Sequence, residues 1–126
     1  LYIFLTVVLV SAACSVKEKG KSGTLFHFAH DTGIDFRNDL AYTEEFNPYT
    51  YRNFYNGAGV AIGDINNDGL DDVFFAGNQT SNRLYLNNGE LKFSDITKEA
   101  GLFSEDVWCT GVSMADVNAD GWLDIY

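Results

Sequence analysis

The sequence predicts an all-β fold, a partial β-propeller with one complete four-stranded blade and the start of the next. Three observations predict it. An aspartate-rich motif occurs twice, at 64–72 and 116–124, with an offset of 52 residues (64 to 116). Short β-type segments flank both copies, and four strands in a period of this length are typical of a propeller blade. Since a propeller closes with about four to eight blades, we expect the chain to be a fragment of a larger protein.

Residues 1–13 are expected to be an export signal. The run LYIFLTVVLV is apolar but shorter than the ~20 residues of a membrane-spanning helix, and the small residues Ala12 and Ala13 directly precede Cys14. This pattern resembles a bacterial lipoprotein signal, which implies lipid attachment at Cys14 and a lipidated tether over 14–24. An ordinary cleaved signal and an uncleaved anchor are the alternatives. The resemblance implies an exported protein, lipid-anchored at the outer membrane or cell surface of a bacterium.

Residues 25–56 are expected to lead into the blade. The segment 25–36, LFHFAHDTGIDF, alternates loosely and predicts one or two strands, whereas 38–56 predicts an ordered loop with a turn at Asn47-Pro48. A polar group of potential chemical interest lies here, formed by His27, His30 and Asp31. Without a third metal ligand or a helical frame, we interpret the histidines as half-exposed strand residues.

Residues 57–108 are predicted to form the first blade and 109–126 the start of the second. In the first expected strand, Val60 and Ile62 share one face, while the other face carries only Gly and Ala, as needed where backbones crowd together. Asn87-Asn88-Gly89 predicts a tight hairpin between the last two strands. Cys109 is expected to be a small buried hydrophobe. The four strands are expected at 59–63, 73–76, 83–86 and 91–96.

Both repeated motifs read D-x-N-x-D-G-x-x-D. Calcium takes about six to eight oxygen ligands, which alternate residues of a tightly curled loop can supply, and glycine at position six (Gly69 or Gly121) permits the sharp reversal. We predict ligands at positions one, three, five, seven and nine, with the backbone carbonyl serving at seven. These are Asp64, Asn66, Asp68, Leu70 and Asp72 in the first loop, and Asp116, Asn118, Asp120, Trp122 and Asp124 in the second.

Three other interpretations of the motif compete with a calcium site that joins two strands. Asx-type turns explain one or two aspartates in each loop, but they leave carboxylates repelling one another without a cation. A helix-flanked calcium loop needs an acidic residue at position twelve, where the first loop has Phe75. Magnesium retains several waters and rarely uses a dedicated protein cage. A structural calcium ion is therefore the predicted cofactor.

The segments GVAIGDINNDGLDDVFFAGN, NRLYLNN, LKFSDIT and GVSMADVNADGWLDIY resemble the FG-GAP or VCBS-type repeats of integrin-like β-propellers. The form is similar to that of large bacterial surface proteins that often also carry an ASPIC/UnbV-type domain. The resemblance covers about residues 56–126. It implies that the aspartate loop joins the first two strands of each blade and holds calcium at the positions named above.

The charge and the motifs favour a non-enzymatic binding or adhesion module. The net charge of −10 argues against a nucleic-acid surface, which needs clustered Lys and Arg. The sequence contains no nucleophile-elbow, P-loop or zinc-helix motif. We expect an unidentified protein or glycan as the surface ligand, and membrane contact through the lipid. The alternative is part of a polysaccharide hydrolase or lyase whose catalytic residues lie outside this chain.

Overall fold

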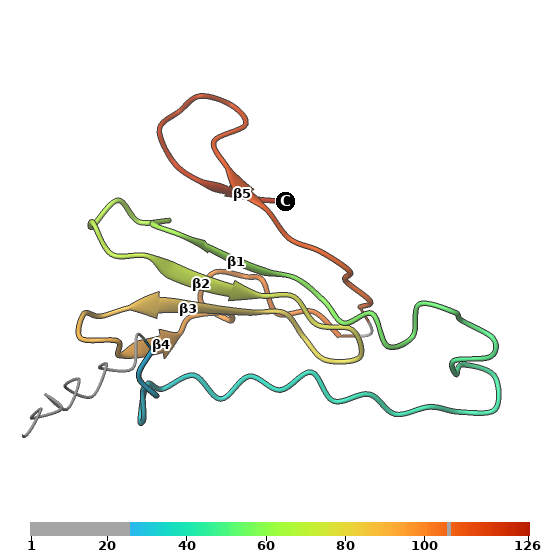
Figure 1. Cartoon of the computed structure of the whole chain (residues 1–126). Helices are drawn as coiled ribbons and strands as arrows, with labels where there is room; N and C mark the ends of the chain where they lie inside the picture. Colours follow the sequence, from blue (N-terminus) through green and yellow to red (C-terminus); the bar gives the residue numbers. More distant parts are fainter. Residues whose placement is uncertain (1–25, 106) are drawn as a thin grey trace, which may run out of the picture.

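The computed structural model describes residues 26–105 and 107–126. The predicted signal and the whole predicted tether, Cys14 included, therefore lie outside the described residues. Within those two ranges the chain forms six strands in two antiparallel sheets (Figure 1). They include no helix that is long and apolar enough to cross a membrane. The predicted all-β class is confirmed.

The first sheet is a four-stranded meander in which every strand pairs with the next one along the chain. Pairing runs from Val60 opposite Phe75, through Val73 opposite Tyr85, to Tyr85 opposite Asp95. This is the blade predicted from the sequence. Its strands are β1 (Val60–Gly63), β2 (Asp72–Phe75), β3 (Arg83–Asn87) and β4 (Phe93–Asp95).

The second sheet is the short hairpin of β5 (Met114–Ala115) and β6 (Asp124–Ile125). Ser113 and Tyr126 extend it by exchanging backbone hydrogen bonds of 2.8 and 2.9 Å. It repeats the β1–β2 hairpin, with the second aspartate motif in the same place. The chain therefore contains one blade and the start of the next.

The core lies between the blade and this second hairpin. Phe74, Ala76 and Leu84 are buried on one face of the blade, and Met114 and Ile125 pack against them. Cys109 packs against the same cluster, but it is half-buried and not fully buried as expected.

Two glycines explain how closely the two units, the blade and the second hairpin, meet. Gly59 directly precedes β1, and Gly63 is its last residue. A Cβ added at Gly59 would lie 2.5 Å from the backbone nitrogen of Val112, and one added at Gly63 would lie 2.7 Å from Cδ1 of Leu123. Real Cβ atoms do not approach other atoms so closely, so a side chain at Gly59 would push against the backbone of the second hairpin, and one at Gly63 would displace the Leu123 side chain. The expected crowding on the Gly and Ala side of β1 is thus confirmed.

The opposite face of the blade is covered in part by the segment that precedes it. Phe36 stacks on Phe75 with ring centroids 4.9 Å apart, and the Tyr85 hydroxyl donates to Asp35 at 2.7 Å. The β1 end of this face stays open, where Val60 and Ile62 are 56% and 64% exposed.

Two expectations about strands are wrong. No strand forms within 26–36, although alternate residues from Thr32 onward are half-buried. The left-handed backbone at Asp31 and Gly33 interrupts any ladder, and the segment crosses the blade instead of extending it. It meets the β4 end through the Phe93 N–H, which donates to the Thr32 carbonyl at 2.7 Å.

The last hairpin is also longer than predicted. Gly89, Glu90 and Leu91 all have positive φ, which curls the chain through a wider loop, so β4 begins at Phe93 and not at Leu91. The Asn88 N–H closes this loop by donating to the Lys92 carbonyl at 2.7 Å.

Candidate metal centre

Both aspartate motifs form the connection between two adjacent antiparallel strands. The first runs from the end of β1 to the start of β2, and the second from β5 to β6. Position six is left-handed in each, with φ of +87° at Gly69 and +90° at Gly121, and position four is left-handed at Asn67 and Ala119. The glycine in the motif is therefore required by the backbone.

The two loops are held by the same hydrogen bonds. The carboxylate at position one accepts two backbone N–H groups: Asp64 receives those of Asp68 (3.1 Å) and Gly69 (2.8 Å). Asp116 receives the equivalent pair from Asp120 (3.1 Å) and Gly121 (2.9 Å). Each loop is thus wound around the side chain with which it begins.

The side chains at positions three and five repeat as well. In the first loop, Asn66 Oδ1 accepts from the Asp68 N–H at 3.1 Å, Asn66 Nδ2 donates to Asp68 Oδ2 at 2.9 Å, and Asp68 Oδ1 accepts from the Leu70 N–H at 2.8 Å. The second loop makes the same three contacts among its own residues, Asn118, Asp120 and Trp122. Residues at the same position of the motif therefore make the same hydrogen bonds in both loops.

The aspartate at position nine connects each loop to the following strand. Asp72 is fully buried, and its two oxygens accept the N–H groups of Ile65 at 3.1 Å and Asn87 at 2.8 Å. Asp124 accepts the N–H of Val117 at 3.0 Å in the same way. Asp72 thus fixes the first loop against both its own start and β3.

The predicted ligands are therefore close along the chain, but their carboxylates are directed at backbone amides. Among residues 26–105 and 107–126, no three His, Cys, Asp or Glu side chains gather closely enough to hold a metal ion. The loops therefore have the geometry of Asx turns, which is one of the alternatives to a calcium site that the sequence leaves open. His27, His30 and Asp31 likewise form no such group.

The chemistry of the donor set nevertheless fits calcium. Carboxylate, amide and backbone carbonyl oxygens are hard donors, and a carboxylate oxygen that accepts one N–H still has a free lone pair. No basic side chain neutralises the loops within the described ranges, where the ion pairs are Arg37 with Asp39 and Arg83 with Asp95. Each loop thus holds its acidic side chains within a few residues of one another, with no ion pair to a basic side chain in the described part of the chain.

The two loops also contact each other, which the sequence analysis did not predict. Asn67 at position four donates from Nδ2 to the carbonyl of Gly121 at 3.2 Å. The second motif has Ala119 at this position, so the difference between the two copies was visible in the sequence. Its partner was not, because the contact joins residues 54 apart in the chain.

Asn78 is a second residue whose role the sequence analysis missed. It is 1% exposed, and its Nδ2 donates to the carbonyls of Gly57 (3.2 Å) and Cys109 (2.9 Å). Asn38 exchanges a further pair of hydrogen bonds with it, at 2.7 and 3.0 Å. One amide thus joins the leading segment, the entry to β1 and the chain that leads into the second unit.

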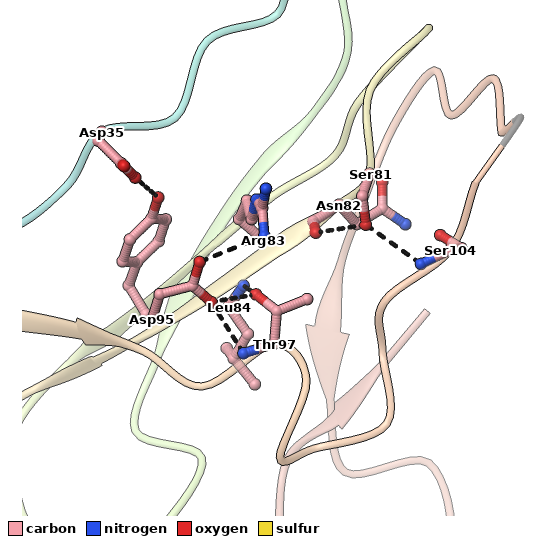
Figure 2. A network of polar contacts seen from close by, with 9 residues as sticks. Asp35, Ser81, Asn82, Arg83, Leu84, Asp95, Thr97 and Ser104 are labelled. Atoms are coloured by element: carbon pink, nitrogen blue, oxygen red, sulfur yellow. Dashed lines mark hydrogen bonds and ion pairs between the residues drawn. The ribbon is translucent and has the colours of Figure 1, made fainter.

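The far end of the blade carries a separate polar network (Figure 2). Burial raises the pKa of Asp95, but hydrogen bonds from Thr97 and the charges of Arg83 and Lys98 outweigh burial, so this pKa lies below its ordinary value. Burial, together with the hydrogen bond to Asp35, raises the pKa of Tyr85 to about 12. The network joins β3 and β4 to the segments that flank them, apart from the aspartate loops.

Comparison with known proteins gives a family match for the second half of the chain. A family model described as an FG-GAP-like repeat matches residues 64–126, which is half of the chain. Cartilage acidic protein 1 of Xenopus tropicalis is 35% identical over 95 residues, which cover 74% of this chain and 14% of the relative. The Homo sapiens protein of the same name is 35% identical over 69 residues, which cover 55% and 10%. No solved structure gives a significant match.

Proposed function

This chain belongs to the FG-GAP-like repeat family, and from that premise we propose that it is a calcium-stabilised propeller segment that serves as a non-enzymatic binding module. The observation that carries the proposal is the repetition of one loop geometry at two equivalent strand connections. Six hydrogen bonds recur at the same motif positions in both loops. Such agreement indicates that both loops serve the same purpose.

Calcium would be held in the first loop by Asp64, Asn66, Asp68 and Asp72 with the carbonyl of Leu70. In the second loop it would be held by Asp116, Asn118, Asp120 and Asp124 with the carbonyl of Trp122. A bound divalent cation supplies charge neutralisation, because it offsets the repulsion between carboxylates crowded into one short loop. The protein's own part is to hold the loop in the left-handed turn at Gly69 or Gly121. This role is structural.

A binding function is favoured over catalysis. Repeats of this family are generally binding modules without catalytic residues. The strong features of the chain, which are the loops, the glycine contacts and the amide of Asn78, hold strands and neighbouring units together. The matched relatives are far longer, since the matched part of the chain spans only 14% and 10% of their lengths. The proposal therefore concerns the repeat region and leaves other parts of the whole protein open.

Export and lipid anchoring are also part of the proposal. They rest on the apolar run followed by Ala12, Ala13 and Cys14, which resembles a lipoprotein signal. A lipid at Cys14 would hold the repeats at the outer membrane or cell surface of a bacterium. Metabolic labelling with a palmitate analogue should mark the wild-type protein and leave Cys14→Ser unlabelled. Equal labelling of both proteins would reject Cys14 as the anchor.

The calcium site is tested by thermal unfolding of the full-length protein. A ligand that binds only the folded state stabilises it by about 2.7 kcal/mol at a concentration near 100 times its Kd, so calcium should raise the Tm and a chelator should reverse the change. Asp64→Ala combined with Asp68→Ala should diminish the gain, whereas Asp39→Asn, an exposed carboxylate outside the loops, should retain it. A Tm that responds to neither calcium nor chelator would overturn the assignment.

A further inference from the structure

A hollow of about 780 Å³ opens in the loop that precedes the blade, in the part of the chain coloured cyan to green in Figure 1. Three tyrosines line it, together with Glu44, Asn47 and Pro48. Tyr42, Tyr49 and Tyr55 are 71%, 99% and 67% exposed. Neither the aspartate loops nor the contacts between the two units use these rings. Large aromatic groups gathered in water are typical of an interaction site.

The Asn47 side chain makes four of the hydrogen bonds that shape the hollow. Asn47 Nδ2 donates to the carbonyls of Thr43 (3.0 Å) and Glu44 (2.9 Å), while its Oδ1 accepts the N–H groups of Tyr49 (2.9 Å) and Thr50 (3.3 Å). The two sides of the hollow are thus joined by a single amide. A site that is already shaped costs less conformational entropy when a ligand binds.

The loop is also anchored to the body of the protein by an aromatic cluster. Phe46 packs edge-on against Trp108 with centroids 4.9 Å apart, and it contacts Phe54, which is fully buried, at 5.3 Å. Tyr51 contacts both Phe46 and Trp108, at 5.4 and 5.5 Å. The segment that carries the three tyrosines is therefore held to the body of the protein by this cluster, and Tyr55 contacts it through Phe54, with ring centroids 5.1 Å apart.

The charge of the residues that line the hollow favours a cationic ligand. Apart from the tyrosines, Glu44 is the one ionisable residue among those that line it, and the whole chain carries a net charge of −10. Tyrosine rings attract cations through the negative face of the π-system, and a neighbouring carboxylate adds to that attraction. An anionic ligand would meet repulsion here.

The charge of Glu44 favours a basic peptide over a neutral sugar. The Asn47 amide is fully used by its own loop, so the side-chain groups of the lining that can meet a ligand are the tyrosine hydroxyls and the Glu44 carboxylate. The Thr43 hydroxyl already accepts the Phe46 N–H at 3.0 Å. The volume exceeds that of one Lys or Arg side chain, so flanking peptide residues have room beside the cation.

We propose that this hollow, which we call the tyrosine hollow, binds a Lys or Arg side chain within a basic peptide segment of a protein partner. The proposal rests on the proposed function of the repeats as a binding module, and it specifies the partner's chemistry. The tyrosine rings would surround the cationic group, and Glu44 would pair with it. The aspartate loops take no direct part.

The test is isothermal titration calorimetry of the calcium-loaded full-length protein. The probe is acetyl-Gly-Lys-Gly-Arg-Gly-amide, with a peptide carrying Gln in place of Lys and Arg as its control. Tyr42→Ala combined with Tyr49→Ala should weaken binding about tenfold, because each exposed cation–π contact contributes modestly. Glu44→Gln should weaken it about threefold and reduce its dependence on salt. Tyr126→Ala and Glu99→Gln, which change exposed residues elsewhere, should bind as the wild type does.

Four results would overturn the proposal: no heat of binding at millimolar basic peptide, equal binding of the Gln peptide, equal binding by the hollow variants, or hollow-dependent binding of the neutral sugar cellohexaose in place of the basic peptide. Failure here is distinguishable from failure of the calcium site. A protein that keeps its calcium-dependent Tm but does not bind the peptide refutes the hollow alone. A protein that binds the peptide without any response to calcium refutes the calcium site alone.

Discussion

At the scale of single residues, a few polar side chains organise the chain by accepting or donating several backbone hydrogen bonds at once. Asp64 and Asp116 each gather two N–H groups of their own loop, and Asn78 joins three segments. Such residues are costly to replace because their partners are left without hydrogen bonds. Tyr85 acts differently, since this fully buried residue makes a single side-chain hydrogen bond, from its hydroxyl to the Asp35 carboxylate.

The raised pKa of Tyr85 predicts how stability depends on pH. The pKa of the Tyr85 phenol is about 12 in the folded protein, whereas it has the ordinary value of 10.0 in the unfolded chain. The contribution of Tyr85 to the free energy of unfolding is therefore fully present below pH 10 and is lost as the pH rises through 12. Urea unfolding of the wild type and Tyr85→Phe between pH 8 and pH 12 measures it.

Below pH 10 the wild type should be more stable than Tyr85→Phe by about 1 kcal/mol, the net value of a typical hydrogen bond. This difference should narrow above pH 10, because only the wild type has the phenol to ionise. A difference that stays constant across the whole range would show that the Tyr85 proton is not linked to folding.

At the scale of strands and loops, the blade could be predicted because its signals are local. The alternation in β1, the apolar β2 and the turn residues fix strand order in a meander, where each strand pairs with its neighbour in sequence. The segment from Thr32 to Leu40 shows why the rest could not be predicted. It alternates in burial like a strand, yet its contacts are with Phe75, Tyr85 and Asn78, far along the chain.

The same limit applies to the candidate site. The motif alone predicted which residues lie in each loop, and it predicted the left-handed turn at Gly69 and Gly121. It could not predict that Asp72 would be buried and bonded to Asn87, or that Asn67 would reach the other loop, because both contacts depend on how separate elements pack.

Because the second unit packs on β1, we expect Gly59→Ala and Gly63→Ala to lower the free energy of unfolding by different amounts. In Gly59→Ala the new Cβ meets the backbone of Val112 and Gly111, which cannot move aside, so we expect a loss of roughly 1–3 kcal/mol. In Gly63→Ala it meets the side chains of Leu123 and Met114, which can shift, so the loss should stay below about 1 kcal/mol. Urea unfolding compares them, and equal losses would contradict the described approach of the two units.

At the scale of the whole molecule, the chain is a repeated unit whose two copies are joined at three places. The shared core, the glycine contacts and the hydrogen bond from Asn67 to Gly121 bring the second aspartate loop beside the first. The exposed Val60 and Ile62 leave an open apolar margin on the other face of the blade, where a further blade of a propeller would pack. Architecture and the proposed ion binding therefore depend on the same loops.

We propose that each aspartate loop holds one calcium ion, and counting the bound ions tests this proposal most directly. Isothermal titration of the full-length protein with calcium should give one ion fewer for Asp64→Ala combined with Asp68→Ala, and one fewer for Asp116→Ala combined with Asp120→Ala. Combining all four substitutions should remove two ions, while Asp39→Asn should remove none. An unchanged number of bound ions in the four-substitution variant, with its fold verified by circular dichroism, would contradict the account.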